Sequence, residues 1–194
     1  MTEKPIRHTL SISELELLSD LVGQQLQFVG GENLDVHALA ESIVVATESN
    51  ETKILIGLVD DKFEGFEDEY PVLGVVKAST AQKDAIERLG NFNVTFAGSV
   101  ISDVSLVRDV INCRHLGSTI WSLETDMGLV IHLGQAAISF VNLTDYDIVG
   151  KLAFHPRFDP SELPSAKTLQ ENDLVNTYEV SRGLVSLPND VKGD

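Results

Sequence analysis

The sequence contains a single cysteine, Cys113, among its 194 residues. One cysteine excludes an intramolecular disulfide and any zinc site built from several cysteines. The chain also lacks a run of 18 apolar residues, so no segment is predicted to cross a membrane as a helix. Its first ten residues include Lys4 and Arg7 but no apolar stretch, which is not the pattern of a secretion signal. We therefore expect a cytoplasmic protein.

Basic residues are scarce. The chain has 14 Lys and Arg against 30 Asp and Glu, so its formal net charge is 14 − 30 = −16. Such a surface repels phosphate groups, and we expect neither a nucleic acid nor an anionic membrane as partner. It attracts basic proteins, mainly by speeding their encounter. The same charge would also serve solubility alone.

Motifs for catalysis and cofactor binding are missing as well. Gly30 and Gly31 form an isolated pair, no Gly-Lys-Ser or Gly-Lys-Thr occurs, and no serine sits in a Gly-x-Ser-x-Gly sequence. We therefore predict no cofactor and no catalytic residue. Cys113, His132 and Asp126 could supply a nucleophile, a base and an acid. Chains of this size offer many such triplets, and the apolar residues before Cys113 favour its burial.

Metal-binding patterns are weak. None of the five histidines is spaced for joint metal ligation on a helix. Cys113, His115 and His132 would bind zinc only if the fold brought them together. A calcium loop beginning at Asp60 fails because Lys62 occupies a ligand position. We predict no metal site.

The pattern that the sequence does contain is a helix followed by strands. Ser11 and Glu14 have the spacing of a capping box, which predicts a helix over residues 13–22, and Gly23 is a natural stop. Alternating apolar residues over 25–29 then predict a strand.

The same order recurs further along the chain. Residues 81–89 have a helical pattern and residues 92–97 alternate like a strand. The glycines and apolar residues that match between the two copies lie 67 or 68 positions apart. Leu26, Phe28, Leu129 and Ile131 fall on the apolar faces of predicted strands, as do Val94, Phe96 and Trp121, and all seven are expected to be buried.

Predicted hairpins continue this repeat. Residues 43–46 and 54–56 read as strand, turn, strand, and residues 120–123 and 129–131 read the same way. The sequence thus predicts a strand-rich α+β fold of two similar halves, each a helix on an antiparallel sheet, produced by internal duplication and related by a pseudo-two-fold axis.

We assign the first half to residues 1–78, the second to 79–152, and a C-terminal extension to 153–194, all within one compact globular unit. The extension is predicted to hold a loop, a helix over 165–175 and a last strand over 178–187 that is broken by Gly183. The oligomeric state is left open, and a homodimer is compatible with the sequence.

An acidic segment is the most distinctive local feature. It carries six carboxylates and one lysine between positions 60 and 69, and aromatic residues punctuate it. Aromatic anchors ringed by acids suit a basic protein surface. Alternatively, the segment is a solvated loop whose aromatics fold back onto the core. The predicted partner-binding residues are Asp60, Asp61, Phe63, Glu64, Phe66, Glu67, Asp68, Glu69 and Tyr70.

The charge, the acidic segment and the missing catalytic motifs favour a non-catalytic interaction module that binds a basic protein. An inhibitor or toxin-neutralising immunity protein is its most concrete form. The alternative is a small-molecule-binding or hydrolytic domain that uses a cleft between the two halves. A deep pocket would favour the alternative, and a filled acidic surface would favour the interaction module.

Overall fold

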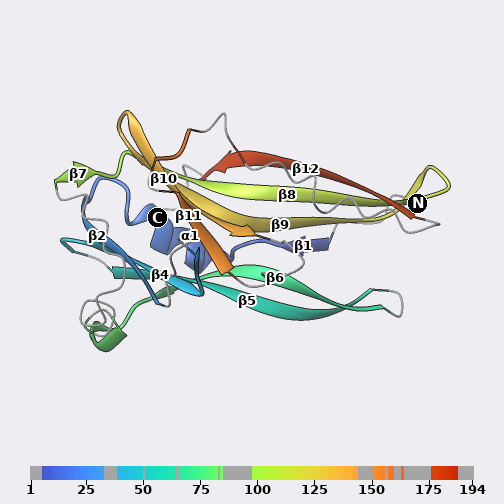
Figure 1. Ribbon diagram of the computed structural model, residues 1–194, viewed down its shortest axis with the longest axis horizontal. Coiled ribbons are helices and arrows are strands. Elements are labelled where there is room, and N and C mark those ends of the chain that lie inside the picture. The colour runs from blue at the N-terminus through green and yellow to red at the C-terminus, as the bar shows by residue number, and fades with distance from the viewer. Residues whose placement is uncertain are drawn as a thin grey trace.

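Two β-sheets face each other in the computed structural model of the chain, with the helix α1 (Ile12–Ser19) between them (Figure 1). The structure describes residues 6–32, 39–49, 51–63, 66–82, 84, 98–143, 151–155, 157–159, 163 and 176–187. No helix in these ranges is long and apolar enough to cross a membrane.

The first sheet has seven strands. Its path runs β12 (Asn176–Ser186), β8 (Asp103–His115), β9 (Ser118–Leu133), β10 (Ala136–Leu143), β11 (Lys151–His155) and β3 (Leu39–Ala40). The neighbours along this path are antiparallel. The short N-terminal strand β1 (Ile6–His8) lies beside β9 and runs parallel to it.

The second sheet has five strands, all antiparallel to their neighbours. Its path runs β6 (Phe66–Lys77), β5 (Glu51–Phe63), β4 (Ser42–Thr47), β2 (Gln25–Glu32) and β7 (Ser99–Val100). The hairpin of β5 and β6 and the hairpin of β8 and β9 both extend beyond the body of the molecule toward the same end (Figure 1).

The main core fills the space between the sheets. Leu18 and Leu21, from α1 and the turn after it, are fully buried there with Ile54 of one sheet and Phe140 of the other. Phe140 stacks on Phe154 of β11 with ring centroids 5.3 Å apart. Burial of this continuous apolar layer is the main stabilising term of the fold.

The predicted α+β class with two similar halves is wrong. Strands make up 69% of the structure and helices 10%, so the fold is built almost wholly from antiparallel sheet. The two sheets do not correspond to the two predicted halves, because β1 and β3 join the seven-stranded sheet and β7 joins the five-stranded one. Of the second predicted helix and strand, only residues 81, 82 and 84 are described, and they are helical; the rest lies outside the described residues.

The second predicted hairpin is also wrong, because residues 118–133 form one continuous strand. The sequence pattern predicts Gly128 as part of the turn of this hairpin. It instead lies where β9 and β10 approach closely: a Cβ there would be 2.2 Å from the carbonyl oxygen of Phe140. Beside it, the register skips Met127, since Val107 pairs with Gly128 and Arg108 with Asp126. The unpaired residue makes a β-bulge in β9 next to Gly128.

The predicted first helix, the strand over 25–29 and the hairpin over 43–56 are confirmed by α1, β2 and the β4–β5 pair. The predicted burial is confirmed for Leu26, Leu129 and Ile131. Phe28 is only half-buried, because a register shift between Leu26 and Phe28 turns it away from the main core and against Val44. Val94, Phe96 and the helix over 165–175 lie outside the described residues.

Two further corrections concern strand β12 and Trp121. Gly183 does not break the last strand, since it pairs with Arg108 inside an unbroken ladder. Trp121 is half-buried and contacts the ring of Tyr178 on β12, with centroids 6.1 Å apart.

Glu14 joins α1 to the edge of the second sheet. Its carboxylate accepts hydrogen bonds from the Ser11 N–H and hydroxyl, as the capping-box spacing predicted, and from the Val75 N–H on the edge strand β6. Burial acts to raise the pKa of Glu14, but the hydrogen bonds from Ser11 and Val75 favour the charged form, and the pKa is lowered from its ordinary value.

Candidate functional site

The acidic segment is a hairpin and not the loop that the sequence suggested. Its described residues form the outer ends of β5 and β6, and Glu64 and Gly65 lie outside the described residues. The register sets Asp60 opposite Glu69, Asp61 opposite Asp68, Lys62 opposite Glu67 and Phe63 opposite Phe66, and Tyr70 opposite Val59.

This register has an electrostatic consequence. Two of the cross-strand pairs join like charges, and a third joins Lys62 to Glu67. Like charges directly opposite each other destabilise an antiparallel pair, whereas opposite charges stabilise it. The outer hairpin therefore holds an excess of negative charge that one lysine cannot balance.

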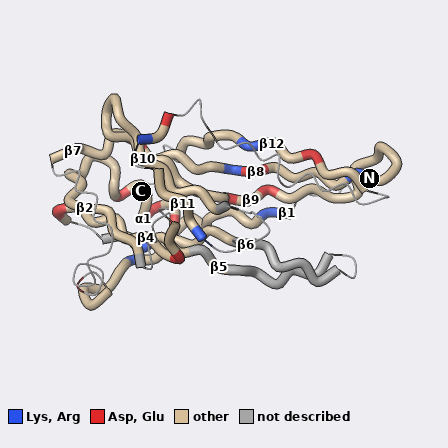
Figure 2. The backbone as a smooth tube through the Cα atoms, in the orientation of Figure 1, with Lys and Arg blue, Asp and Glu red and all other residues tan. Residues whose placement is uncertain are grey.

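Strands β8, β9 and β12 carry charges of both signs, seen as red and blue segments along them (Figure 2). On one face of the sheet, Arg182 of β12 binds Asp109 of β8 through two N–O contacts of 2.7 Å each. Asp109 is fully buried and the Arg182 side chain is 8% exposed. This bidentate pair attaches β12 to β8.

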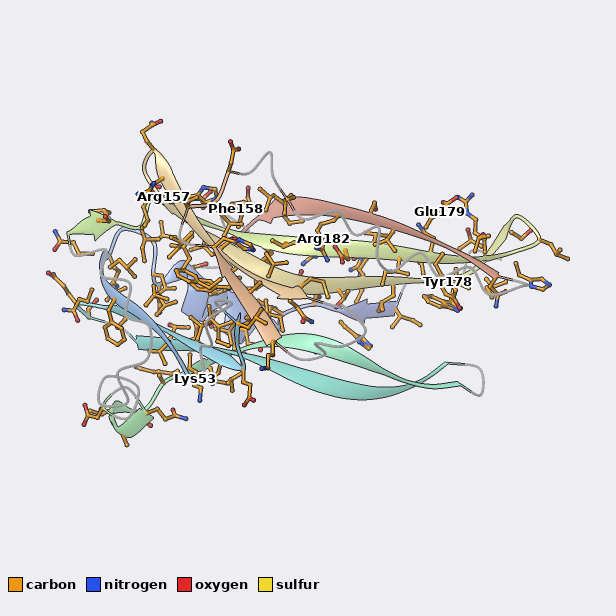
Figure 3. All side chains as sticks on the ribbon, viewed as in Figure 1. Lys53, Arg157, Phe158, Tyr178, Glu179 and Arg182 are labelled. Carbon is orange, nitrogen blue, oxygen red and sulfur yellow. The ribbon has the colours of Figure 1, made fainter. Side chains whose placement is uncertain are left out.

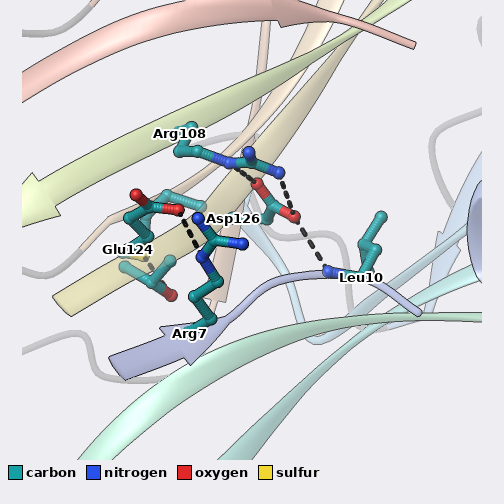
Figure 4. Close-up of polar contacts among 7 residues, drawn as sticks. Arg7, Leu10, Arg108, Glu124 and Asp126 are labelled. Carbon is teal, nitrogen blue, oxygen red and sulfur yellow. Dashed lines mark hydrogen bonds and ion pairs between the residues drawn. The ribbon is translucent and has the colours of Figure 1, made fainter. Parts of the chain in front are cut away.

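A second Asp–Arg pair lies on the opposite face of the same strand. Arg108 donates to Asp126 of β9 at 2.8 and 3.2 Å, and Arg108 and Asp109 are adjacent along β8, so they point to opposite sides. Asp126 also accepts the Leu10 N–H at 2.9 Å (Figure 4). One carboxylate, 1% exposed, thus holds both β8 and the segment after β1.

Strand β1 is attached to β9 beside this pair. Ile6, Arg7 and His8 lie opposite Leu123, Glu124 and Thr125, and the Arg7 guanidinium is 3.2 Å from the carboxylate of Glu124 (Figure 4). The Arg7 side chain is 65% exposed. The contact of β1 with β9 is thus one in which a basic residue of a short extended segment, Arg7, pairs with an acidic residue of the neighbouring strand, Glu124.

The edge strand β12 shows the alternation of a sheet strand with one covered face. Tyr178 and Glu179 project to opposite sides of it (Figure 3). Tyr178 contacts Trp121, and Glu179 is 2.9 Å from Arg114 of β8 in a half-exposed ion pair.

The residues considered as a catalytic triplet do not meet. Cys113 is buried, as predicted, opposite Trp121, and Asp126 is bound to Arg108. Cys113 is five ladder positions from Asp126, about 17 Å at strand spacing, and Asp126 is six positions from His132, about 20 Å. These three side chains therefore cannot act on one substrate.

Sequence reasoning missed a different pair, Ser105 and His132. The Ser105 hydroxyl oxygen is 3.1 Å from His132 Nε2, and Asp103 lies opposite His132 in the ladder. However, Ser105 is only 5% exposed, and one oxygen of Asp103 accepts the Val104 N–H. A nucleophile must reach its substrate, and the burial of Ser105 argues against that role. Its only sequence signal is the alternation of Asp103 and Ser105 along one strand.

The three residues considered for zinc do not meet at one point, since His132 pairs with Asp103 at the other end of the β8–β9 ladder from Cys113. Cys113 is buried, the His115 Nδ1 is 3.2 Å from Asn176 Oδ1, and His132 contacts Ser105. Within the part of the chain that the structure describes, no group of three His, Cys, Asp or Glu side chains is arranged to hold a metal ion.

No protein family, curated protein or solved structure matches this chain.

Proposed function

We propose that this chain is a non-catalytic binding module for a basic partner protein, and that the outer β5–β6 hairpin is its contact surface. A protein that inhibits or neutralises a basic toxin is the most concrete form. The observation that carries the proposal is the hairpin register, which sets acid opposite acid at two successive pairs.

A basic partner would relieve this repulsion. In the free protein, Asp60–Glu69 and Asp61–Asp68 each oppose hairpin pairing. Cationic side chains placed beside them would turn a repulsive arrangement into an attractive one, so binding and hairpin stability are coupled. The net charge of −16 supports the same partner by steering it toward the surface.

The two classes of residue in the hairpin have different roles in this proposal. The carboxylates act at long range, over about 8 Å at physiological salt, and govern the association rate. Phe63 and Phe66, opposite each other near the tip, are the candidate anchors. Loss of an aromatic anchor shortens the lifetime of a complex more than it slows encounter.

The test is to isolate the partner from the source cells and to measure association and dissociation rates across a salt series. Neutralising Asp61, Glu64, Glu67 and Asp68 together should slow association roughly tenfold and flatten its salt dependence. Phe66→Ala should mainly speed dissociation.

The matched control, Glu16→Gln with Asp20→Asn, neutralises two exposed acids at α1, far from the hairpin in sequence. For each charge removed, this control should lower the association rate less than the hairpin neutralisations do. Association that is unchanged after all four hairpin neutralisations would remove the hairpin from the mechanism. If no macromolecular partner is recovered, the proposal is rejected in favour of a small-molecule ligand. The cleft between two similar halves that the sequence suggested for such a ligand would not be its site, because those halves are not formed.

A further inference from the structure

The edge of β9 that faces away from β8 is divided between two strands. β10 pairs with residues 128–133, and β1 pairs with Leu123, Glu124 and Thr125. Among the described residues, no strand pairs with positions 118–122 on that side. Backbone groups on an exposed edge are available to pair with an incoming strand.

Strand β1 is weakly held in its place on β9. Three register pairs attach it, compared with eleven between β12 and β8. In its ion pair with Glu124, the Arg7 side chain is 65% exposed and the Glu124 side chain 25%, and partly exposed pairs of this kind contribute modestly. Although Leu10 after it is buried in the main core, a strand paired over so few positions is expected to open locally before the molecule unfolds globally.

The place that β1 occupies is suited to a basic segment. Glu124 presents a carboxylate to the second residue of the strand, and Asp126 accepts the Leu10 N–H just beyond its end. Because Arg108 fixes the Asp126 carboxylate by two hydrogen bonds, this acceptor stays in position when the strand leaves.

We propose that β1 is a displaceable strand, and that its place on β9 is the docking site for an extended basic segment of the partner. The incoming segment pairs in parallel with β9, sets an Arg or Lys against Glu124 and donates a backbone N–H to Asp126. This inference rests on the proposed function, since it assumes the same basic partner. A second copy of the chain is a poor occupant because each copy carries a charge of −16.

The test uses the full chain and a fluorescent peptide with the sequence of residues 4–11, KPIRHTLS, as the probe. A second peptide, KPIEHTLS, carries Glu in place of the Arg. Arg7→Glu repels the chain's own strand from Glu124 and frees the place. Glu124→Arg also frees it, but with the opposite charge.

We expect the Arg7→Glu chain to bind the Arg peptide about fivefold or more tightly than the wild-type chain does, because the competing strand is weakened. The same chain should prefer the Arg peptide to the Glu peptide, and the Glu124→Arg chain should reverse that order. Each variant then binds one of the two peptides, which shows that both are folded.

The same order of affinities in both variants, or no binding to either, overturns the inference. A third outcome is that Asp61→Asn with Asp68→Asn abolishes peptide binding while Glu124→Arg leaves it unchanged. The peptide would then bind the β5–β6 hairpin, which would support the proposed function but contradict this inference. Light scattering that shows the wild-type chain to be a dimer, with β1 exchanged between copies, would assign the place to self-association and also overturn it.

Discussion

Strands β12 and β1 flank the β8–β9 hairpin on opposite sides, and they are held very differently. β12 pairs with β8 over eleven positions and is fixed by the buried Arg182–Asp109 pair. β1 pairs with β9 over three positions, and it is fixed by the partly exposed Arg7–Glu124 pair and by Leu10, whose side chain is buried and whose N–H binds Asp126. The comparison separates a permanent edge strand from one that can be exchanged.

Both strands depend on an Asp–Arg pair, but the two pairs have different partners. The Asp109 carboxylate accepts hydrogen bonds from Arg182 and so joins β8 to β12. The Asp126 carboxylate accepts hydrogen bonds from Arg108 and also from the Leu10 N–H in the segment after β1. A strand can be exchanged only if the groups that bind it keep their positions after it leaves. The Asp126 carboxylate is such a group, because Arg108 of β8 holds it in place on β9.

The largest expected effect concerns Gly128, which marks the boundary on β9 between β10 and β1. Gly128→Ala places a Cβ 2.2 Å from the Phe140 carbonyl oxygen and 2.8 Å from the Val141 Cα, both backbone atoms. We expect a loss of about 3 kcal/mol or more in the free energy of unfolding, measured by urea denaturation. The control Gly183→Ala on β12 meets nothing within 4 Å and should change stability by less than about 1 kcal/mol. Equal effects would mean that the β9–β10 approach is wrong.

The second prediction tests how β12 is held. Asp109→Asn removes the buried carboxylate that binds the Arg182 guanidinium and should cost about 3 kcal/mol. The matched change Glu179→Gln breaks the half-exposed pair with Arg114 on the same strands and should cost less than about 1 kcal/mol. If thermal or urea melts show that Asp109→Asn costs no more than Glu179→Gln, β12 is not anchored by its buried pair.

The smallest of the stability effects concerns Glu14, which covers part of the β6 edge. Glu14→Gln should cost about 1 kcal/mol at neutral pH, because a capping interaction and a bond to the Val75 N–H are weakened. A carboxylate whose pKa is lowered in the folded state stabilises above the ordinary value of 4.5 and loses that contribution as the pH falls through its folded pKa.

The measurement for Glu14 is therefore a pair of urea melts at each pH. The difference between wild type and Glu14→Gln should be largest near neutral pH and should shrink below pH 4.5. Glu16→Gln, an exposed change on the same helix, is the control and should show no such trend. A Glu14 difference that grows as the pH falls would contradict the hydrogen-bond account.

Local patterns in the sequence predicted local structure well. The Ser11 and Glu14 spacing predicted the start of α1, and alternation over 25–29 predicted β2. These features depend on residues a few positions apart, so their signal is present in a short window.

The wrong predictions concern features that depend on contacts between segments far apart in the sequence. Gly128 resembles a turn residue until β10 is known to lie against it, and the partner of Asp109 lies 73 positions away at Arg182. The acidic composition of the hairpin was visible in the sequence, but its like-charge pairs depend on the register of two strands. Nothing in the pattern of Ile6 to His8 indicates parallel pairing with β9.

The most direct test of the displaceable strand is native-state hydrogen exchange on the wild-type chain. The Leu10 N–H, which binds Asp126, reports on the docking of the β1 segment, and the amides of β12 that pair with β8 report on the permanent edge. We predict that the Leu10 amide exchanges through a local opening, at least about a hundredfold faster than the slowest β12 amides. Exchange of Leu10 only through global unfolding, at the rate of those β12 amides, would contradict the claim that β1 can leave its place on β9.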